Sequence, residues 1–472
     1  MVLGFVVRLY KINTPLADWH SWRQVDTASV TKIFLSKGID VLHPRYYDIS
    51  SIQTGFFNPN GYRMVEFPVF NLLHVALIKI LPRLSVEIAG RLVSIFSSLI
   101  TAFFLFLIGK RFISNLGGVL SAFFYLFLPY NIYFTRVILP EPLATTFSVV
   151  GIWFFILWID KNKDWYLYFS GIWLALSLLI KPYFALFLVP LLYLTIKKYG
   201  LKKIFGDGKL VIRAVVFLDI VLLPLLLWRI WINGYSTGIP FFEWAFNGDH
   251  IRFRPAFWRW IFTERLVKLI LASWGLPLFF LGLVRKDLKS NFILFYLLGM
   301  FLYVSIVATA NVRHDYYQIF AVPAIALAVG AGGDFLLKNK LFNYVIAYFG
   351  FGFMVVMLLG TGIYQVKEFY KINHPELIRA GKAIRRLTPP DARVIAPYNG
   401  DTAFLYQTER FGWPAVDTSF DKLIKERGAD YYVSVNKGDA DTKYIISKYK
   451  VIEETTEYLI ADLHQPLGGL KK

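Results

Sequence analysis

Residues 91–112 read RLVSIFSSLITAFFLFLIGKRF. An apolar run of this length that ends beside basic residues is typical of a membrane-spanning helix with a cytoplasmic end. Apolar blocks of similar length recur along the chain, which is 56% hydrophobic and 18% charged. That composition is too apolar for an ordinary soluble enzyme. It predicts a polytopic α-helical membrane protein.

A series of apolar segments approaches the roughly 20 residues that a tilted spanning helix needs. We expect spans at residues 90–108, 116–134, 143–159, 165–180, 183–196, 210–232, 266–284, 291–310, 318–337 and 342–364. Residues 1–8 are apolar but too short to cross, and we interpret them as the stump of a first helix. The sequence thus predicts about eleven spans, the first of them truncated.

The connectors between the expected spans alternate in charge. Every second one is short and basic, namely KRFISN (110–115), DKNKD (160–164), KKYGLKKIFGDGK (197–209), RKDLKS (285–290) and KNK (338–340). Because such loops stay in the cytoplasm, the other connectors and the chain before residue 90 are expected outside. These loops also hold much of the net charge of +19, so we expect no nucleic-acid partner. The lack of cysteine excludes disulfides and thiol catalysis.

Two regions are expected outside the spans. In the first outer loop, residues 9–89, the run VFNLLHVALIKIL (69–81) has the length of an interfacial helix rather than of a span. The transmembrane domain follows at 90–364. Residues 365–472 are expected to form a small extracytoplasmic α/β domain, because helix-like segments alternate with strand-like ones at 374–387, 392–398, 420–429, 430–435 and 458–463. We expect a plasma-membrane protein with its active site on the outer side.

The first outer loop contains an unusually polar run, DWHSWRQVDT, at residues 18–27. Its two acids are candidate catalytic carboxylates, since ionisable groups gathered on one side of a membrane suggest a site. Asp26 or Thr27 could instead only cap a helix over DTASVTKIFLSKG (26–38). Asp18 is less easily explained as a cap. The polar neighbours that we include in the candidate site are His20, Arg23 and Gln24.

The later outer connectors add acids and bases. Glu141 lies between two prolines at the mouth of a span, where a catalytic carboxylate and an N-terminal cap are both open interpretations. Glu66 precedes a proline in the first loop and could be a solvated acid. Arginine and lysine together can hold a phosphate, although each alone often anchors a helix at the interface. The basic candidates for a donor phosphate are Lys181, Arg313, His314, Arg23 and Arg136, with Tyr316 beside them.

Metal binding receives little support. Asp18 and His20 are close in sequence, but the spacing of a third and fourth ligand is absent. We therefore predict no metal ligands and no definite cofactor, and we leave assistance by a divalent cation open.

The order of several motifs resembles that of the GT-C membrane glycosyltransferases of the protein O-mannosyltransferase and lipid A aminoarabinose transferase type. After a large acidic first loop, the chain continues with residues 91–112 and then with LPYNIYFTRVILPEPLATTF (128–147), LALSLLIKPYFALFLVPLL (174–192) and HDYYQIFAVPAIALAVG (314–330). The similarity extends to about residue 340, and the run HSWRQ marks a subgroup.

This resemblance implies an inverting transferase that moves a sugar from a polyprenyl-phosphate donor to an acceptor lipid, glycan or protein on the outer face. It implies a first-loop aspartate as general base and a second acid at the mouth of a later span, a position that Glu141 matches. Alignment on ASVTKIFL (28–35) places Arg23 and Gln24 where relatives have an Asp-Glu pair. Asp26 lies three residues from Arg23, so we expect Asp26 to be the base, with Asp18 as the other candidate.

Two other classes of function remain as alternatives. The first is a transporter or flippase of polyprenyl-linked or lipid substrates, and the second is an envelope protein that acts through its α/β domain. A transporter would concentrate charges near the bilayer midplane and often repeat its helices, whereas this chain gathers charges on one face and shows no internal repeat. The enzyme is therefore the favoured interpretation, with membrane lipids, donor and acceptor as partners.

Overall fold

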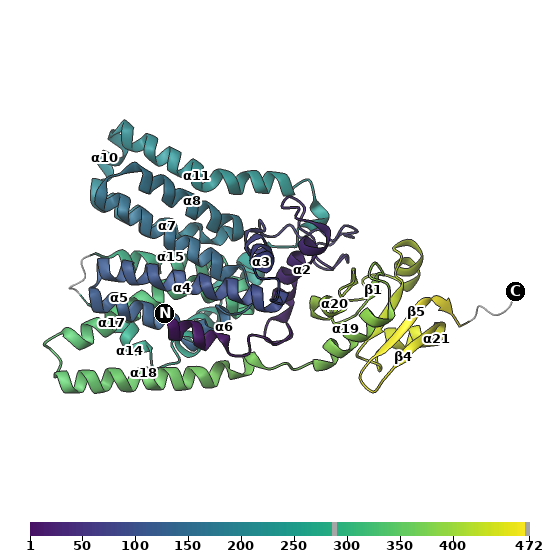
Figure 1. The fold of residues 1–472 in the computed structure, drawn as a ribbon. Coiled ribbons are helices and arrows are strands. Elements are labelled where there is room, and N and C mark those ends of the chain that lie inside the picture. Colours follow the sequence, from purple (N-terminus) through teal and green to yellow (C-terminus); the bar gives the residue numbers. More distant parts are fainter. Residues whose placement is uncertain (286–289, 468–472) are drawn as a thin grey trace. The chain divides into compact units, whose positions relative to one another are not determined.

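The computed structural model describes residues 1–285 and 290–467, and its chain divides into two compact units (Figure 1). Unit 1 comprises residues 1–12, 91–229 and 242–368. Unit 2 comprises residues 13–90, 230–241 and 369–472. Unit 2 thus joins most of the expected first loop to most of the expected C-terminal domain. The domain boundaries at residues 8, 89 and 364 remain predictions.

Unit 1 is helical. Its first part contains α1 (Val2–Val6), most of α4 (Val86–Phe112), α5 (Asn115–Phe127), α6 (Pro129–Phe134), α7 (Glu141–Lys161), α8 (Asp164–Ile180), η2 (Pro182–Phe187), α9 (Leu188–Tyr199), α10 (Leu201–Gly206) and most of α11 (Gly208–Ile232). Its second part contains α12 (Trp244–Asn247), α13 (Pro255–Arg259), η5 (Trp260–Ile270), α14 (Leu276–Val284), α15 (Phe292–Ile306), α16 (Ala308–Arg313), η6 (Asp315–Phe320), α17 (Val322–Lys338) and α18 (Tyr344–Val366).

Several expected spans are interrupted, and their prediction as continuous helices was wrong. The segment 116–134 breaks at Leu128, because a residue before proline disfavours the helical conformation. The segment 266–284 breaks where Ala272 and Ser273 take positive φ angles of 48° and 62°. The segment 291–310 breaks at Val307, and 183–196 begins as a 3₁₀ turn. Apolar composition predicted these helices but not their breaks.

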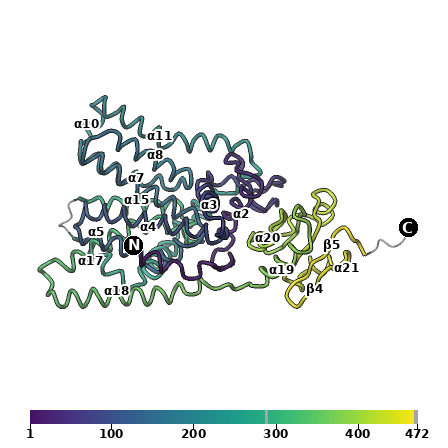
Figure 2. Tube along the Cα trace, in the orientation of Figure 1, coloured from purple at the N-terminus to yellow at the C-terminus, as the bar shows by residue number. Residues whose placement is uncertain are grey.

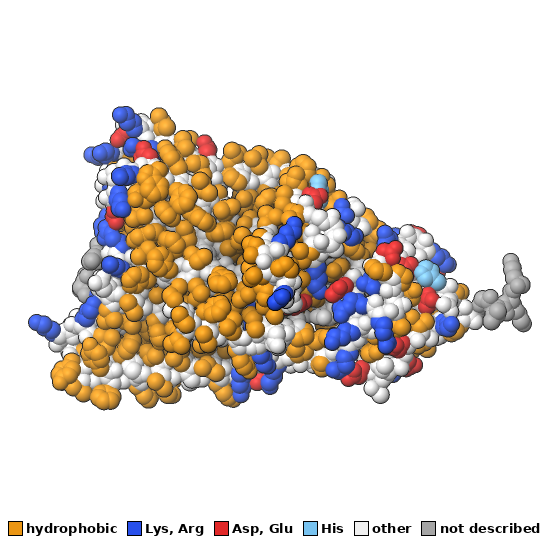
Figure 3. Space-filling model, in the orientation of Figure 1, with side chains coloured by type: hydrophobic (Ala, Val, Ile, Leu, Met, Phe, Trp, Pro, Cys, Tyr) orange, Lys and Arg blue, Asp and Glu red, His pale blue; other side chains and the backbone are white. Residues whose placement is uncertain are grey.

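Within the described residues, four helical stretches are long and apolar enough to cross a membrane, at Val86–Phe112, Glu141–Lys161, Gly208–Ile232 and Tyr344–Leu387. Hydrophobic side chains dominate the visible face of unit 1, and Lys and Arg gather at the end near α10 (Figure 3). This is the pattern that a lipid-facing surface with a basic margin shows. The count of about eleven spans stays a prediction, and connector RKDLKS lies mostly outside the described residues.

The helices of unit 1 pack closely at small residues. Helices α7 and α8 lie side by side (Figure 2), and α14 packs against α17. A Cβ added at Gly282 would lie 1.9 Å from the Ala328 carbonyl oxygen, and one at Gly332 would lie 1.7 Å from that of Leu278. Because no side chain fits there, these glycines bring the backbones of α14 and α17 into contact, as in other membrane helix pairs.

The first-loop part of unit 2 contains α2 (Ser21–Lys37) and α3 (Val69–Ile80). Helix α3 confirms the helix expected at 69–81. The prediction that Asp26 or Thr27 caps α2 was wrong, because α2 begins five residues before Asp26 and His20 occupies its N-cap position. The helix starts early because buried polar side chains along its first turns find partners within unit 2.

The C-terminal part of unit 2 forms the expected α/β fold. Its helices are α19 (Pro375–Leu387), α20 (Thr402–Thr408), η8 (Lys422–Glu426) and α21 (Ala440–Lys448). Its strands are β1 (Val394–Ile395), β2 (Gly412–Trp413), β3 (Tyr431–Ser434), β4 (Tyr449–Glu454) and β5 (Leu459–Pro466), in the order β2-β1-β3-β5-β4. Strand β1 pairs parallel with β2 and β3, whereas β5 pairs antiparallel with β3 and β4. Helices α20 and α21 and strands β2 and β4 were not predicted from the sequence.

The first loop extends this sheet. Asp48 forms a parallel bridge with Gly412. The Gly412 amide donates to the Tyr47 carbonyl, and the Gly412 carbonyl accepts from the Ile49 amide. A Cβ at position 412 would lie 1.8 Å from the Val394 carbonyl oxygen, so only glycine fits this strand. Ile49 is buried in the same hydrophobic core as the sheet. The two segments of unit 2 therefore fold as one body.

Candidate active site

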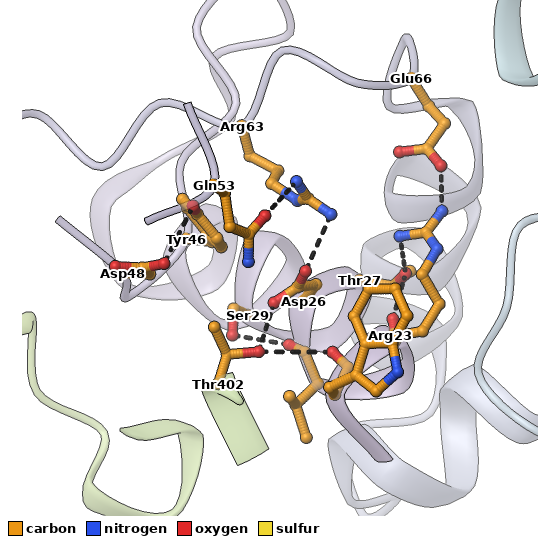
Figure 4. A network of polar contacts seen from close by, with 12 residues as sticks. Arg23, Asp26, Thr27, Ser29, Tyr46, Asp48, Gln53, Arg63, Glu66 and Thr402 are labelled. Atoms are coloured by element: carbon orange, nitrogen blue, oxygen red, sulfur yellow. Dashed lines mark hydrogen bonds and ion pairs between the residues drawn. The ribbon is translucent and has the colours of Figure 1, made fainter. Parts of the chain in front are cut away.

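Asp26 lies at the centre of a buried polar network in unit 2 (Figure 4). Its side chain projects from α2 and is 1% exposed. One carboxylate oxygen, Oδ2, lies 2.8 Å from Nη2 of Arg63, and the other, Oδ1, accepts a 2.6 Å hydrogen bond from the Thr402 hydroxyl. A buried carboxylate needs such partners to remain ionised. The network therefore holds a carboxylate in a fixed orientation.

Arg63 is itself fixed by its neighbours. Its Nη1 donates to the Gln53 side-chain oxygen at 2.9 Å, and its guanidinium carbon lies 5.1 Å from the centre of the Tyr46 ring. Neither Arg63 nor Thr402 was a sequence candidate. They lie 37 and 376 residues from Asp26, and no motif spacing connects them with it.

Two further acids of unit 2 have raised pKa values. Burial raises the pKa of Asp48 to about 6, and the charge of Asp26 adds to the rise against the hydrogen bonds from Ser50. Burial likewise raises the pKa of Asp401 to about 6, again with a contribution from Asp26. Acids with raised pKa values gather at functional sites more often than elsewhere. These two change charge between about pH 5 and 7.

The other candidates of the first loop form a second group. Gln24 Nε2 donates to Asp18 Oδ1 at 2.7 Å, and both side chains are buried. Arg23 forms an ion pair with Glu66, so this acid is not simply solvated. His20 takes a left-handed conformation with φ 54° at the start of α2. The structure thus brings Asp18 and Gln24 together, and Arg23 and Glu66 together.

Glu141 and Lys181 form a buried ion pair in unit 1. Their charged atoms lie 3.2 Å apart, and the two side chains are 1% and 7% exposed. Pro140 occupies the cap position and Glu141 is the first residue of α7, where the helix dipole favours a negative charge. The pairing of these two sequence candidates places an acid and a base at the start of one helix.

Lys181→Met is expected to destabilise the protein by about 3–5 kcal/mol, because a buried carboxylate loses its cation. Thermal unfolding in detergent measures the loss. The double variant Lys181→Met/Glu141→Gln should recover most of it, since no buried charge is then left behind. Equal stability of Lys181→Met and the double variant would show that the pair contributes little.

The remaining basic candidates also lie in unit 1. Arg136 is fully buried and donates to the Lys11 carbonyl at 2.8 Å. The guanidinium of Arg313 and the ring of His314 lie 5.8 Å and 5.6 Å from the ring of Trp244. Tyr316 stacks beside His314 with ring centres 5.6 Å apart. The expected single cavity that joins these residues to Asp26 stays a prediction.

Unit 1 contains a cavity of about 640 Å³ whose wall is almost wholly aliphatic and aromatic. Its polar lining groups are the side chains of Arg265 and Gln318. Arg265, which was not a candidate from the sequence, lies 3.7 Å from Asp315 and donates to the Val312 carbonyl at 2.7 Å. A second apolar cavity of about 380 Å³ lies between α7, α8, α9 and α11. The first cavity therefore combines an apolar wall with an arginine that is paired with Asp315.

Among the described residues, no cluster of three or more His, Asp or Glu side chains is arranged to hold a metal ion.

Residues 68–228 match the model of the dolichyl-phosphate-mannose-protein mannosyltransferase family. Comparison with curated proteins found no match. The fold is similar to that of ArnT from Cupriavidus metallidurans in the apo state, with a TM-score of 0.65 and 11% identity over 98% of this chain and 96% of that one. The structure of the same protein bound to undecaprenyl phosphate gives a TM-score of 0.61 at 12% identity, again over 98% and 96% of the two chains.

The fold is also similar to that of the oligosaccharyltransferase AglB from Archaeoglobus fulgidus, solved with an inhibitory peptide and a dolichol-phosphate. The TM-score is 0.55 at 11% identity, over 97% of this chain and 73% of that one. Together with the family model, these structures confirm the predicted GT-C fold, with its apolar helices and a small C-terminal sheet domain.

Proposed function

Starting from the GT-C glycosyltransferase fold, we propose that this protein transfers a sugar from a polyprenyl-phosphate donor to an acceptor on the outer face of the plasma membrane, with inversion at the anomeric carbon. The similar structures carry undecaprenyl phosphate or dolichol-phosphate, which supports a lipid-linked donor. The basic connectors and the Lys and Arg side chains at one end of unit 1 support the proposed orientation (Figure 3).

The observation that carries the donor class is the cavity of unit 1. Its apolar wall suits a long branched hydrocarbon, and the Arg265 guanidinium suits the phosphate at the head of that chain. A free nucleotide sugar would leave the apolar wall uncovered. An amphiphile with one anionic end is the ligand that matches both features.

In the proposed reaction, Asp26 accepts the proton of the acceptor hydroxyl or amine as the oxygen or nitrogen attacks the anomeric carbon. The bond between that carbon and the phosphate oxygen breaks, and the phosphate leaves on the polyprenyl chain. A single displacement of this kind inverts the anomeric centre. The candidate cations for the departing phosphate are Arg265 and the predicted set of Lys181, Arg313, His314, Arg23 and Arg136.

Purified protein in detergent is expected to transfer sugar from polyprenyl-phosphate donors. The kcat/KM should be higher for donors with long polyprenyl chains than for donors with short ones. Leu298→Trp should raise the KM of the long-chain donor about tenfold and leave that of a short-chain donor almost unchanged, because Leu298 lines the cavity. Radioactive transfer assays measure both constants, and NMR of the product gives the anomeric configuration.

Leu192→Trp is the matched control, since Leu192 lines the second cavity instead. It should leave both KM values near those of the wild type. Detergent removes any second compartment, so transfer under these conditions excludes the transporter alternative. Absence of transfer from every polyprenyl donor, or a retained anomeric configuration, would contradict the proposal.

A further inference from the structure

We propose that Thr402, in the C-terminal α/β segment, is a positioning residue for Asp26, so that this segment belongs to the catalytic machinery. The inference rests on the proposed function, with Asp26 as the base. None of the site candidates predicted from the sequence lies in this C-terminal segment. The observation behind it is the 2.6 Å hydrogen bond from the Thr402 hydroxyl to Asp26 Oδ1 (Figure 4).

The hydroxyl and the arginine act on different oxygens of Asp26. Arg63 faces Oδ2, while Thr402 donates to Oδ1. Two partners on two oxygens fix the rotation of the carboxylate about its terminal bond, which a single partner would leave free. A base must be oriented toward the proton that it removes, so this rotation matters for the rate.

Helix α20 holds Thr402 rigidly. Asp401 caps the helix by accepting from the Ala403 amide at 2.7 Å, and Thr402 is the first helical residue. At the other end, Gln407 donates to the Leu16 carbonyl at 3.1 Å. Helices α20 and α2 lie in direct contact. The hydroxyl therefore reaches Asp26 from a backbone that is anchored at both ends.

Lys32 links the same elements on the surface of α2. Its ammonium lies 2.9 Å from Glu409, 3.9 Å from Glu87 and 4.2 Å from the centre of the Tyr406 ring. Tyr406 in turn donates to Glu87 at 3.0 Å. Together with the strand pairing at Gly412, these contacts fix the register of α20 against α2. The position of Thr402 relative to Asp26 is therefore fixed by several contacts between their two helices.

The hydroxyl also influences the charge of the base. A hydrogen bond donated to a carboxylate favours its ionised form, so its loss shifts the ionisation to higher pH. The groups that face Asp26 are Arg63 from the first loop, Asp48 and Tyr46 from the sheet edge, and Asp401 beside Thr402. Thr402 thus supports a base that stands beside two other carboxyl groups.

The test compares Thr402→Val with Thr402→Ser in steady-state transfer assays between about pH 5 and 9. Valine keeps the shape and removes the hydroxyl, so kcat should fall about 10- to 100-fold with an unchanged KM for the donor. The acidic limb of the pH profile should move to higher pH. Serine keeps the donor and should restore most of the rate and the original pH profile.

Thr408→Val is the matched control. Thr408 is buried at the end of the same helix, and its hydroxyl donates to the Leu405 carbonyl rather than to Asp26. This variant should keep the wild-type pH profile even if it lowers the melting temperature. A Thr402→Val enzyme with wild-type kcat and pH profile, or a Thr408→Val enzyme with the same shift, would overturn the inference. A wild-type protein without any transfer would overturn the proposed function itself.

Discussion

Asp26→Asn is expected to lower kcat for sugar transfer by about 10²–10⁴-fold, the usual contribution of a general base. Asparagine keeps the shape of the side chain and can still accept from Thr402, but it cannot accept the proton of the acceptor. The KM for the donor should change little, because the proposed donor contacts lie in unit 1. Single-turnover assays with saturating donor and acceptor measure the chemical step.

The control for this experiment is Asp48→Asn, the same substitution at a buried acid of the same network. Assays should be run above about pH 7, where Asp48 and Asp401, with pKa values of about 6, are ionised and their titration does not alter the rate. Melting temperatures must accompany the rates, since asparagine leaves Arg63 without its carboxylate partner. Activity in Asp26→Asn within threefold of wild type would exclude Asp26 as the base, and Asp18→Asn would then be the next variant.

Deletion of residues 370–472 is expected to abolish transfer to every acceptor, rather than to change the choice of acceptor. The deletion removes the sheet against which Ile49 and Phe57 of the first loop pack, and it removes the partner of Asp48 at Gly412. Exposing a hydrophobic core of this kind unfolds the segment that remains. Limited proteolysis of membranes that contain the truncated protein should show early cleavage within residues 13–90.

A chain that ends at Leu467 is the control, and it should behave like the full-length protein in expression, proteolysis and transfer. A truncated protein that resists proteolysis and transfers sugar to a different acceptor would instead support a separate domain that selects acceptors. That outcome would also remove the role of Thr402.

Much of the fold was predictable from the sequence, because membrane helices can be recognised from the apolar composition of a short stretch of sequence. The apolar runs around α4, α7, α8, α11 and α18 gave their positions within a few residues. Periodicity also gave α19, β3 and β5. Where prediction failed, the helix breaks within an apolar run, at Leu128 because this residue precedes a proline and at Ala272–Ser273 because both residues take positive φ angles. Hydropathy does not report such a break.

The candidate site was predictable only in part. Asp26, Asp18 and Glu141 were identified as candidates because charged groups are rare in an apolar chain. Glu141 and Lys181 were each predicted as site residues, and the structure pairs them. Arg63, Arg265 and Thr402 carried no such signal, since each is an ordinary residue in its own stretch of sequence. Their importance comes only from what lies next to them.

The sequence by itself predicted a helical membrane protein, its apolar helices and the acids worth testing, since these depend on local composition, and its resemblance to known transferases predicted the GT-C fold. The tertiary structure decided that α2 begins before Asp26, that the first loop completes the C-terminal sheet, and that Thr402 meets Asp26. Contacts between residues hundreds of positions apart arise from packing. Local sequence patterns therefore do not predict the 2.6 Å hydrogen bond between Thr402 and Asp26.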